Sequence, residues 1–298
     1  MTLLPTGVAG TRLAVLLAAV GLILLAAAVR EGYRRWRRRP SRPREVPRYE
    51  GEAAQPATDY TPALAVGALA ALRAGEVLDI VGCRRPRGVI KRELRLRAGP
   101  YLTSVMGEEG VSTAIGRCVN DLLGPGAETV GDHLSGVEEV IRHRRRGGPE
   151  LWGHAIDEWA SRSGLPEVAV AALHDIAARV AGAEDELRAA GVLAEGEFVP
   201  TLLAVHWGQG VHLARGAIAT GWLDRTKGLN YLRRTGELAG RWYPSPGTML
   251  AAQLLPAYLS GDADAIRWAG VAAPKLLADP RSPLTAFPGP GSSREFPR

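Results

Sequence analysis

Three side chains in one apolar segment have the types needed for chemistry: His206, Gln209 and Arg215. We expect this segment to be a helix and the three residues to share roughly one of its faces, where they could line a pocket. Such a pocket would belong to a hydrolase or transferase of unrecognised type. The competing interpretation is that each residue is a satisfied buried or boundary side chain, because single polar residues are weak indicators of a site.

Other histidines form incomplete constellations. His154 lies one helical turn from Asp157 and Glu158, which supplies half of a metal site without a third ligand. His133 is close to Ser135, but no third group is indicated that would orient a nucleophile. We therefore expect no metal site at His154 and no nucleophile site at His133.

Motifs for common cofactors and catalytic machinery are absent from the sequence. It contains no GxxxxGK[ST] phosphate loop, no GxGxxG after a strand, no GxSxG elbow and no HExxH. The two cysteines, Cys83 and Cys118, have no metal-binding spacing, and we expect both to be reduced thiols. We therefore expect no cofactor and no metal, we assign no catalytic residue, and an enzyme is the less favoured class.

The elements that carry these residues are expected to be helices, since apolar positions from Pro149 onward recur with a helical period. Gly221 and the Ser245-Pro246 pair are typical of a helix end and a helix start. The fold class is thus mostly α. The expected helices span 150–162, 166 onward, about 200–220, 224 to about 242, 246 onward and 263–277.

Residues 62–148 are expected to form a small α region with a minor β contribution. Thr61 and Pro62 are typical of a helix start. Residues 76–81 and 89–97 are the plausible strands, and a hairpin could join them across the CRRPRG turn. Residues 285–298 are rich in Pro, Gly and Ser, so we expect a disordered tail.

An apolar segment near the N-terminus predicts a membrane anchor. Leu13 to Val29 are 17 consecutive residues without a charge, ~25 Å of helix and near the lower limit for a bilayer core. We expect a single transmembrane helix at 12–29, with residues 1–11 outside the cell. A signal peptide cleaved near Ala28 is the alternative, but the positive charge follows the apolar segment instead of preceding it.

A basic segment follows immediately. Residues 30–48 hold nine arginines and two glutamates, a net charge of +7 that leaves about −1 for the rest of the chain. Arginines at this place keep the following chain in the cytoplasm, and aromatic rings fit the headgroup layer. The residues expected at the membrane surface are Arg30, Tyr33, Arg34, Arg35, Trp36, Arg37, Arg38 and Arg39.

Residues 30–61 as a whole are expected to be a flexible, basic, Pro-rich linker, because nothing in them can bury a core. The segment sets topology and contacts anionic lipid headgroups in this interpretation. Nucleic-acid binding by Arg30 to Arg48 is a minor alternative, since membrane topology already accounts for the charge. It predicts a DNA affinity that falls steeply with salt.

The C-terminal half resembles a bacterial family named domain of unknown function 1266, over roughly Leu151 to Pro288. The runs HWGQGVHLARGAIATGWLD, RWYPSPGTML and LLADPRSPL carry the resemblance. The matching positions are Arg215, Gly221, Ser282 and Pro283, whereas His206, Gln209 and Leu284 stand where the family has Asp, Arg and Trp. The resemblance implies a helical domain, here 149–284, and no known activity, so it assigns no catalytic residue.

Taken together, the sequence favours a single-pass protein of the inner (plasma) membrane with a mostly helical cytoplasmic domain. We expect this domain to act as a protein-interaction or scaffold module with an unknown protein partner. The alternatives are an enzyme with a pocket in the C-terminal helical domain and a nucleic-acid or anionic-lipid binder that uses the arginine segment.

Overall fold

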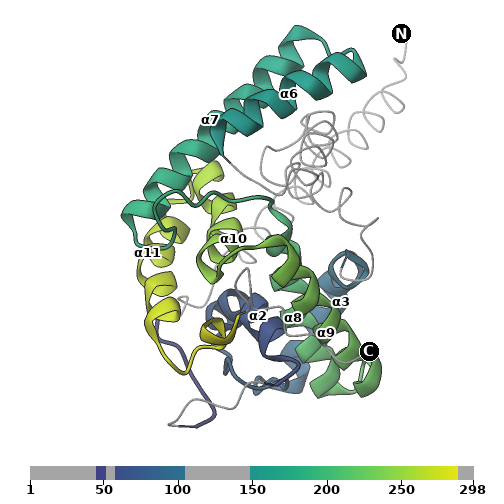
Figure 1. The fold of residues 1–298 in the computed structure, drawn as a ribbon. Helices are drawn as coiled ribbons and strands as arrows, with labels where there is room; N and C mark the ends of the chain where they lie inside the picture. Colours follow the sequence, from purple (N-terminus) through teal and green to yellow (C-terminus); the bar gives the residue numbers. More distant parts are fainter. Residues whose placement is uncertain (1–44, 52–57, 105–147, 288–298) are drawn as a thin grey trace, which may run out of the picture. The chain divides into compact units, whose positions relative to one another are not determined.

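The computed structural model describes residues 45–51, 58–104 and 148–287 (Figure 1). The chain divides into two compact units, Met1–Pro43 and Arg44–Arg298, and all described residues belong to the second. Within them the structure holds eight α-helices, one 3-10 helix and no strand, which confirms a mostly α fold. The predicted outer N-terminus (1–11), membrane helix (12–29), most of the linker, residues 105–147 and the tail from 288 lie outside the described residues.

The helices follow one another in the chain as α2 (Thr61–Ala74), α3 (Arg87–Ser104), α6 (Pro149–Ser163), α7 (Glu167–Ala189), α8 (Leu203–Thr220), α9 (Arg225–Trp242), α10 (Pro246–Ser260), α11 (Ala263–Ala278) and the 3-10 helix η1 (Pro283–Ala286). None of these described helices has both the length and the apolar character that a bilayer crossing requires.

Helix α8 lies at the centre of the core. Helices α2, α3, α9 and α10 all pack against it, and thirteen of its 18 residues are buried. A helix covered on every side must be apolar or small nearly all round. This explains why the sequence of α8 alternates alanine, glycine and branched aliphatic residues with few polar positions.

Glycines let neighbouring helices approach α8 closely. A Cβ added to Gly208 would lie 2.9 Å from Gln253 Oε1 on α10 and 3.1 Å from the Val66 carbonyl oxygen on α2. A Cβ on Gly216 would lie 2.9 Å from Ile90 Cγ2 on α3. The close contacts therefore depend on Gly208 and Gly216, positions at which a larger side chain would separate the helices.

The predicted helix boundaries at Gly221, Asp224 and Ser245 are confirmed. Gly221 ends α8 in the left-handed region at φ 71°, and Asp224 caps α9 by accepting a hydrogen bond from the Lys227 N–H at 3.0 Å. Ser245 and Thr248 form a reciprocal capping box at the start of α10. At α2 the prediction is displaced by one residue, because Tyr60 and not Thr61 occupies the N-cap.

The two predicted strands are wrong. Residues 89–97 belong to α3, and Ile90 and Leu94 on one side of this helix are buried against Leu213 and Ala217 of α8. Their spacing of four residues is helical, and it governs burial, whereas Leu96 is exposed. Residues 76–81 form a loop between α2 and α3.

A buried glutamate links α7 to the segment that leads into α8. Glu184 is 2% exposed, and its Oε1 accepts a hydrogen bond of 2.7 Å from the Val199 N–H. Burial raises the pKa of Glu184 to about 7, although the Val199 N–H and Arg188 act in the opposite direction. The carboxyl group is therefore protonated in the folded chain over a range in which the unfolded chain has already lost the proton.

We expect the stability to fall as pH rises from about 4.5 to about 7, because in this window only the folded state retains the Glu184 proton. Glu184→Gln keeps an acceptor for the Val199 N–H and stays neutral at every pH. It should therefore remove this part of the pH dependence of stability. At pH 8 it should be more stable than the wild type by roughly 1–3 kcal/mol. Melting temperatures between pH 5 and pH 8 measure the effect. Glu186→Gln, on the exposed side of α7, should leave the wild-type slope unchanged.

Two glycine substitutions test the helix packing in opposite directions. A Cβ at Gly236 of α9 would lie 2.9 Å from the Ala63 nitrogen and from Pro62 Cβ, so Gly236→Ala should lower stability by roughly 1–3 kcal/mol. Gly182 of α7 has nothing within 4 Å of such a Cβ, so Gly182→Ala should raise stability by about 0.5–1 kcal/mol. Equal melting temperatures for the two variants would contradict the α2–α9 packing.

Candidate functional site

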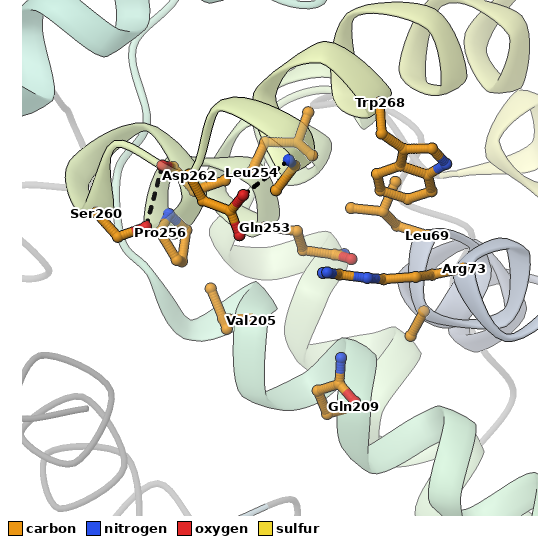
Figure 2. A pocket seen from close by; sticks show the side chains of 13 residues that line it. Leu69, Arg73, Val205, Gln209, Gln253, Leu254, Pro256, Ser260, Asp262 and Trp268 are labelled. Carbon is orange, nitrogen blue, oxygen red and sulfur yellow. Dashed lines mark hydrogen bonds between the residues drawn. The ribbon is translucent and has the colours of Figure 1, made fainter. Parts of the chain in front are cut away.

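A cavity of about 260 Å³ lies among α2, α8, α10 and α11 (Figure 2). Its apolar wall includes Leu69, Val205 and Leu254, and its polar wall includes side chains from all four helices or the turns between them. Pockets for drug-sized ligands hold about 300–1,000 Å³. This cavity therefore suits a smaller molecule, or one or two side chains of a partner.

Arg73 is the cation of the cavity. It lies in the last turn of α2, which ends at the left-handed Gly75, and its guanidinium carbon is 5.7 Å from the centre of the Trp268 ring. Trp268 is buried on α11, so the ring is a fixed platform for the arginine. Among the described residues, no carboxylate forms an ion pair with Arg73.

Two glutamines project from the floor of the cavity, Gln209 on α8 and Gln253 on α10 (Figure 2). The Gln253 Nε2 atom donates a hydrogen bond of 3.0 Å to the Val66 carbonyl of α2. The absence of a side chain at Gly208 makes room for the Gln253 amide. The hydrogen bond holds this amide at the junction of three helices.

Asp262 is the anion of the cavity. It follows Gly261, which ends α10 in the left-handed region at φ 64°, and it caps α11 by accepting a hydrogen bond of 3.0 Å from the Ala265 N–H. Ser260 donates a hydrogen bond of 3.1 Å to the Ala257 carbonyl. Figure 2 shows these two hydrogen bonds on the wall opposite Trp268.

A second group of polar side chains lies where the α2–α3 loop and α3 meet α8. We call it the Arg85 network: Glu76, Cys83, Arg85, Glu93, His212 and Arg215. Arg85 donates to Glu76 through Nε, and its Nη2 lies 2.8 Å from Glu93 Oε2 and 3.0 Å from His212 Nε2. Glu76 also accepts hydrogen bonds from the Cys83 thiol and the Arg84 N–H. One guanidinium thus joins two carboxylates and an imidazole.

Arg215 anchors the same loop from α8. It is 1% exposed, and it donates from Nε and Nη2 to the Gly82 carbonyl at 3.3 and 3.1 Å. Its Nη2 also donates to the Val77 carbonyl. Burial lowers the pKa of Arg215 to about 10, while Glu76 and Cys83 act in the opposite direction. The guanidinium is still charged at neutral pH and binds two loop carbonyls from inside the core.

The electrostatics of the Arg85 network separate charged from neutral members. Burial opposes ionisation of Glu93, but hydrogen bonds and charge from His212 and Arg85 hold its pKa at about 2. Hydrogen bonds likewise outweigh burial and lower the pKa of Glu76. Burial lowers the pKa of His212, so the imidazole is neutral at pH 7. The negative charges of Glu76 and Glu93 therefore balance the positive charges of Arg85 and Arg215.

The same electrostatics make Cys83 a poor nucleophile. Burial and then the Glu76 carboxylate raise the pKa of the thiol, which disfavours the reactive thiolate. Among the described residues, no three His, Cys, Asp or Glu side chains are arranged to hold a metal ion. The Arg85 network therefore binds the α2–α3 loop to α8 and offers no activated group.

The structure does not bring the three predicted pocket residues together. Gln209 lines the cavity, whereas His206 and Arg215 do not, and Arg215 faces the α2–α3 loop. Nine residues at 100° each place Arg215 half a turn away from His206, so the expectation of one shared face was geometrically wrong for this pair. The predicted membrane-surface residues, Arg30 to Arg39, lie outside the described residues.

The acidic neighbours of His154 do not all face it. Asp157 of α6 meets His174 of α7, with 3.1 Å between Asp157 Oδ1 and His174 Nε2. Both side chains are largely exposed. This contact joins the two helices at their surface.

Sequence reasoning missed Arg73, Gln253, Asp262 and Trp268 as parts of one cavity. They come from three helices and a turn that are up to 195 residues apart in the chain, and no local motif joins them. The only local signal was at Asp262, which directly follows a glycine and precedes a helix, as capping residues do.

The Arg85 network gives a stability prediction with an adjacent control. Arg85→Met should lower stability by roughly 3–5 kcal/mol, because it leaves the carboxylates of Glu76 and Glu93 in a desolvated site without their counter-charge. Arg84→Met removes only an exposed pair with Glu50 and should cost at most about 1 kcal/mol. Thermal unfolding of both variants measures the difference, and equal losses would show that the network does not hold the loop.

Comparisons with protein-family models, with curated proteins and with solved structures find no match for this chain.

Proposed function

We propose that this chain is a single-pass, membrane-anchored interaction module that works by binding, and that its binding site is the cavity among α2, α8, α10 and α11. The partner on this proposal engages Arg73, Trp268 and the two glutamines from the solvent side. The module acts at the inner face of the membrane to which the chain is attached.

The observation that carries the proposal is the separation of the cavity from the groups capable of chemistry. Cys83, His212, Glu76 and Glu93 belong to the Arg85 network, and none of them lines the cavity. The cavity wall instead carries an arginine on an aromatic ring, amides and a capping aspartate. These groups recognise a partner through charge and hydrogen bonds, and their ordinary role is orientation and specificity.

The sequence supports the membrane anchor. Seventeen uncharged residues end at Val29, and the basic segment begins at Arg30. This order of apolar and positively charged residues orients a helix with its following chain on the cytoplasmic side. Arg30 to Arg39, with Tyr33 and Trp36, are then proposed to lie in the headgroup layer.

The resemblance to domain of unknown function 1266 is proposed to reflect common descent of the C-terminal helices. Two of its matching positions have clear structural roles that a family would retain. Arg215 binds the α2–α3 loop from inside the core, and Gly221 provides the left-handed end of α8. Both residues act in folding, and this agrees with a family resemblance that assigns no catalytic residue to the chain.

A photo-reactive amino acid at position 257 tests the interaction module in living cells. Ala257 lines the cavity, so we expect cross-linked products there, and none from the same substitution at Ala178, an exposed position on α7. Overpacking the cavity with Arg73→Trp should abolish the products. Identical products from positions 257 and 178 would contradict a binding site at the cavity. Turnover of a metabolite by the purified chain, lost on a single cavity substitution, would favour the enzyme alternative.

A further inference from the structure

The wall of the cavity holds one cation and one anion that do not neutralise each other. Arg73 enters from α2 and Asp262 from the α10–α11 turn, on different walls (Figure 2). Within the described part of the chain, no ion pair joins these two side chains. Both side chains are exposed at the cavity, so a ligand that enters from solvent can reach both charges.

Each charge is held in place by an interaction that leaves it available to a ligand. The Arg73 guanidinium lies over the Trp268 ring, which restricts its position without occupying its N–H donors. Asp262 uses Oδ1 to accept the Ala265 N–H, and a carboxylate has further lone pairs to offer. The cation can therefore bind a carboxylate, and the anion can accept hydrogen bonds from an ammonium group.

The remaining wall is mixed in character. Leu69, Val205 and Leu254 provide apolar surface, and the Gln253 amide is already tied to α2 through its Nε2. A volume of about 260 Å³ lies below the range for drug-sized ligands. A ligand that fits is small and carries two opposite charges and an apolar part.

We propose that the cavity binds a small zwitterion of the neutral α-amino-acid type, with its carboxylate on Arg73, its ammonium group on Asp262 and its apolar side chain against the leucines. The inference rests on the proposed function, because it names the ligand class of the same cavity. It makes the interaction module responsive to a small metabolite.

Three related ligands test the charge requirement on the full-length chain in detergent micelles. Isothermal titration calorimetry compares L-leucine, which carries both charges, with N-acetyl-L-leucine, which lacks the ammonium group, and L-leucinamide, which lacks the carboxylate. A panel of other neutral L-amino acids covers differences in side-chain fit. We expect neutral amino acids to bind and both single-charge derivatives to bind at least tenfold more weakly, since each loses a charge-assisted hydrogen bond.

Two substitutions test which residue binds the carboxylate of the ligand and which binds its ammonium group. Arg73→Gln should weaken L-leucine binding roughly tenfold to a hundredfold and remove any binding of N-acetyl-L-leucine. Asp262→Asn keeps a capping side chain for α11 and should weaken L-leucine and L-leucinamide to a similar extent. Arg241→Gln, at an exposed position on α9, and Asp224→Asn, which caps α9 as Asp262 caps α11, are the matched controls and should bind as the wild type does.

Two results would overturn the inference. One is that no neutral α-amino acid binds the wild-type chain, and the other is that N-acetyl-L-leucine or L-leucinamide binds as tightly as L-leucine. The ligand series uses the wild-type chain alone, so it decides the matter even where a variant fails to fold. Cross-linking from position 257 that persists after either result would retain the binding module and reject only its amino-acid ligand.

Discussion

The burial of Arg215 is the constraint on which much of this fold depends. A guanidinium at 1% exposure must find acceptors inside the protein, and the structure supplies the Gly82 and Val77 carbonyls of the α2–α3 loop. These bonds hold the loop against α8, and the loop in turn delivers Glu76 and Arg85 to the contact with α3. Arg215 on the central helix thus ties the loop that precedes α3 to α8.

The close packing of α2 and α10 against α8 determines the position of the cavity. Gly208 brings α2 and α10 near enough for Gln253 to bond the Val66 carbonyl. The cavity lies beside the last turns of α2 and α10, which end at Gly75 and Gly261. Arg73 and Asp262 are placed there because they occupy the ends of helices, positions at which charged side chains are favoured. The two charges of the wall are thus a product of helix termination, whereas Gln209 and Gln253 project from within α8 and α10.

The sequence allowed the helical class and most C-terminal helix ends to be predicted, because capping residues such as Asp224 and Ser245 act within four residues of themselves. It did not allow α3 to be recognised. Within residues 87–96, the part of α3 whose side chains the structure describes, Ile90 and Leu94 are buried whereas Val89 and Leu96 are exposed. This pattern is too short to separate periods of 2 and 3.6. The cavity was beyond prediction for a different reason: its wall is made by contacts between helices distant in the chain, of which sequence alone indicated only Gln209.

The division between the Arg85 network and the cavity also explains why residue types alone misdirected the search for a site. Histidine, cysteine and glutamate are the residues expected to do chemistry, and here burial and mutual pairing shift their pKa values within a cluster whose charges balance. A perturbed pKa indicates function only where the group can also reach a ligand. Arg73 and Asp262 meet that second condition, because both line a cavity and neither forms an ion pair with the other within the described residues. Access, and not reactivity, therefore distinguishes the cavity from the Arg85 network.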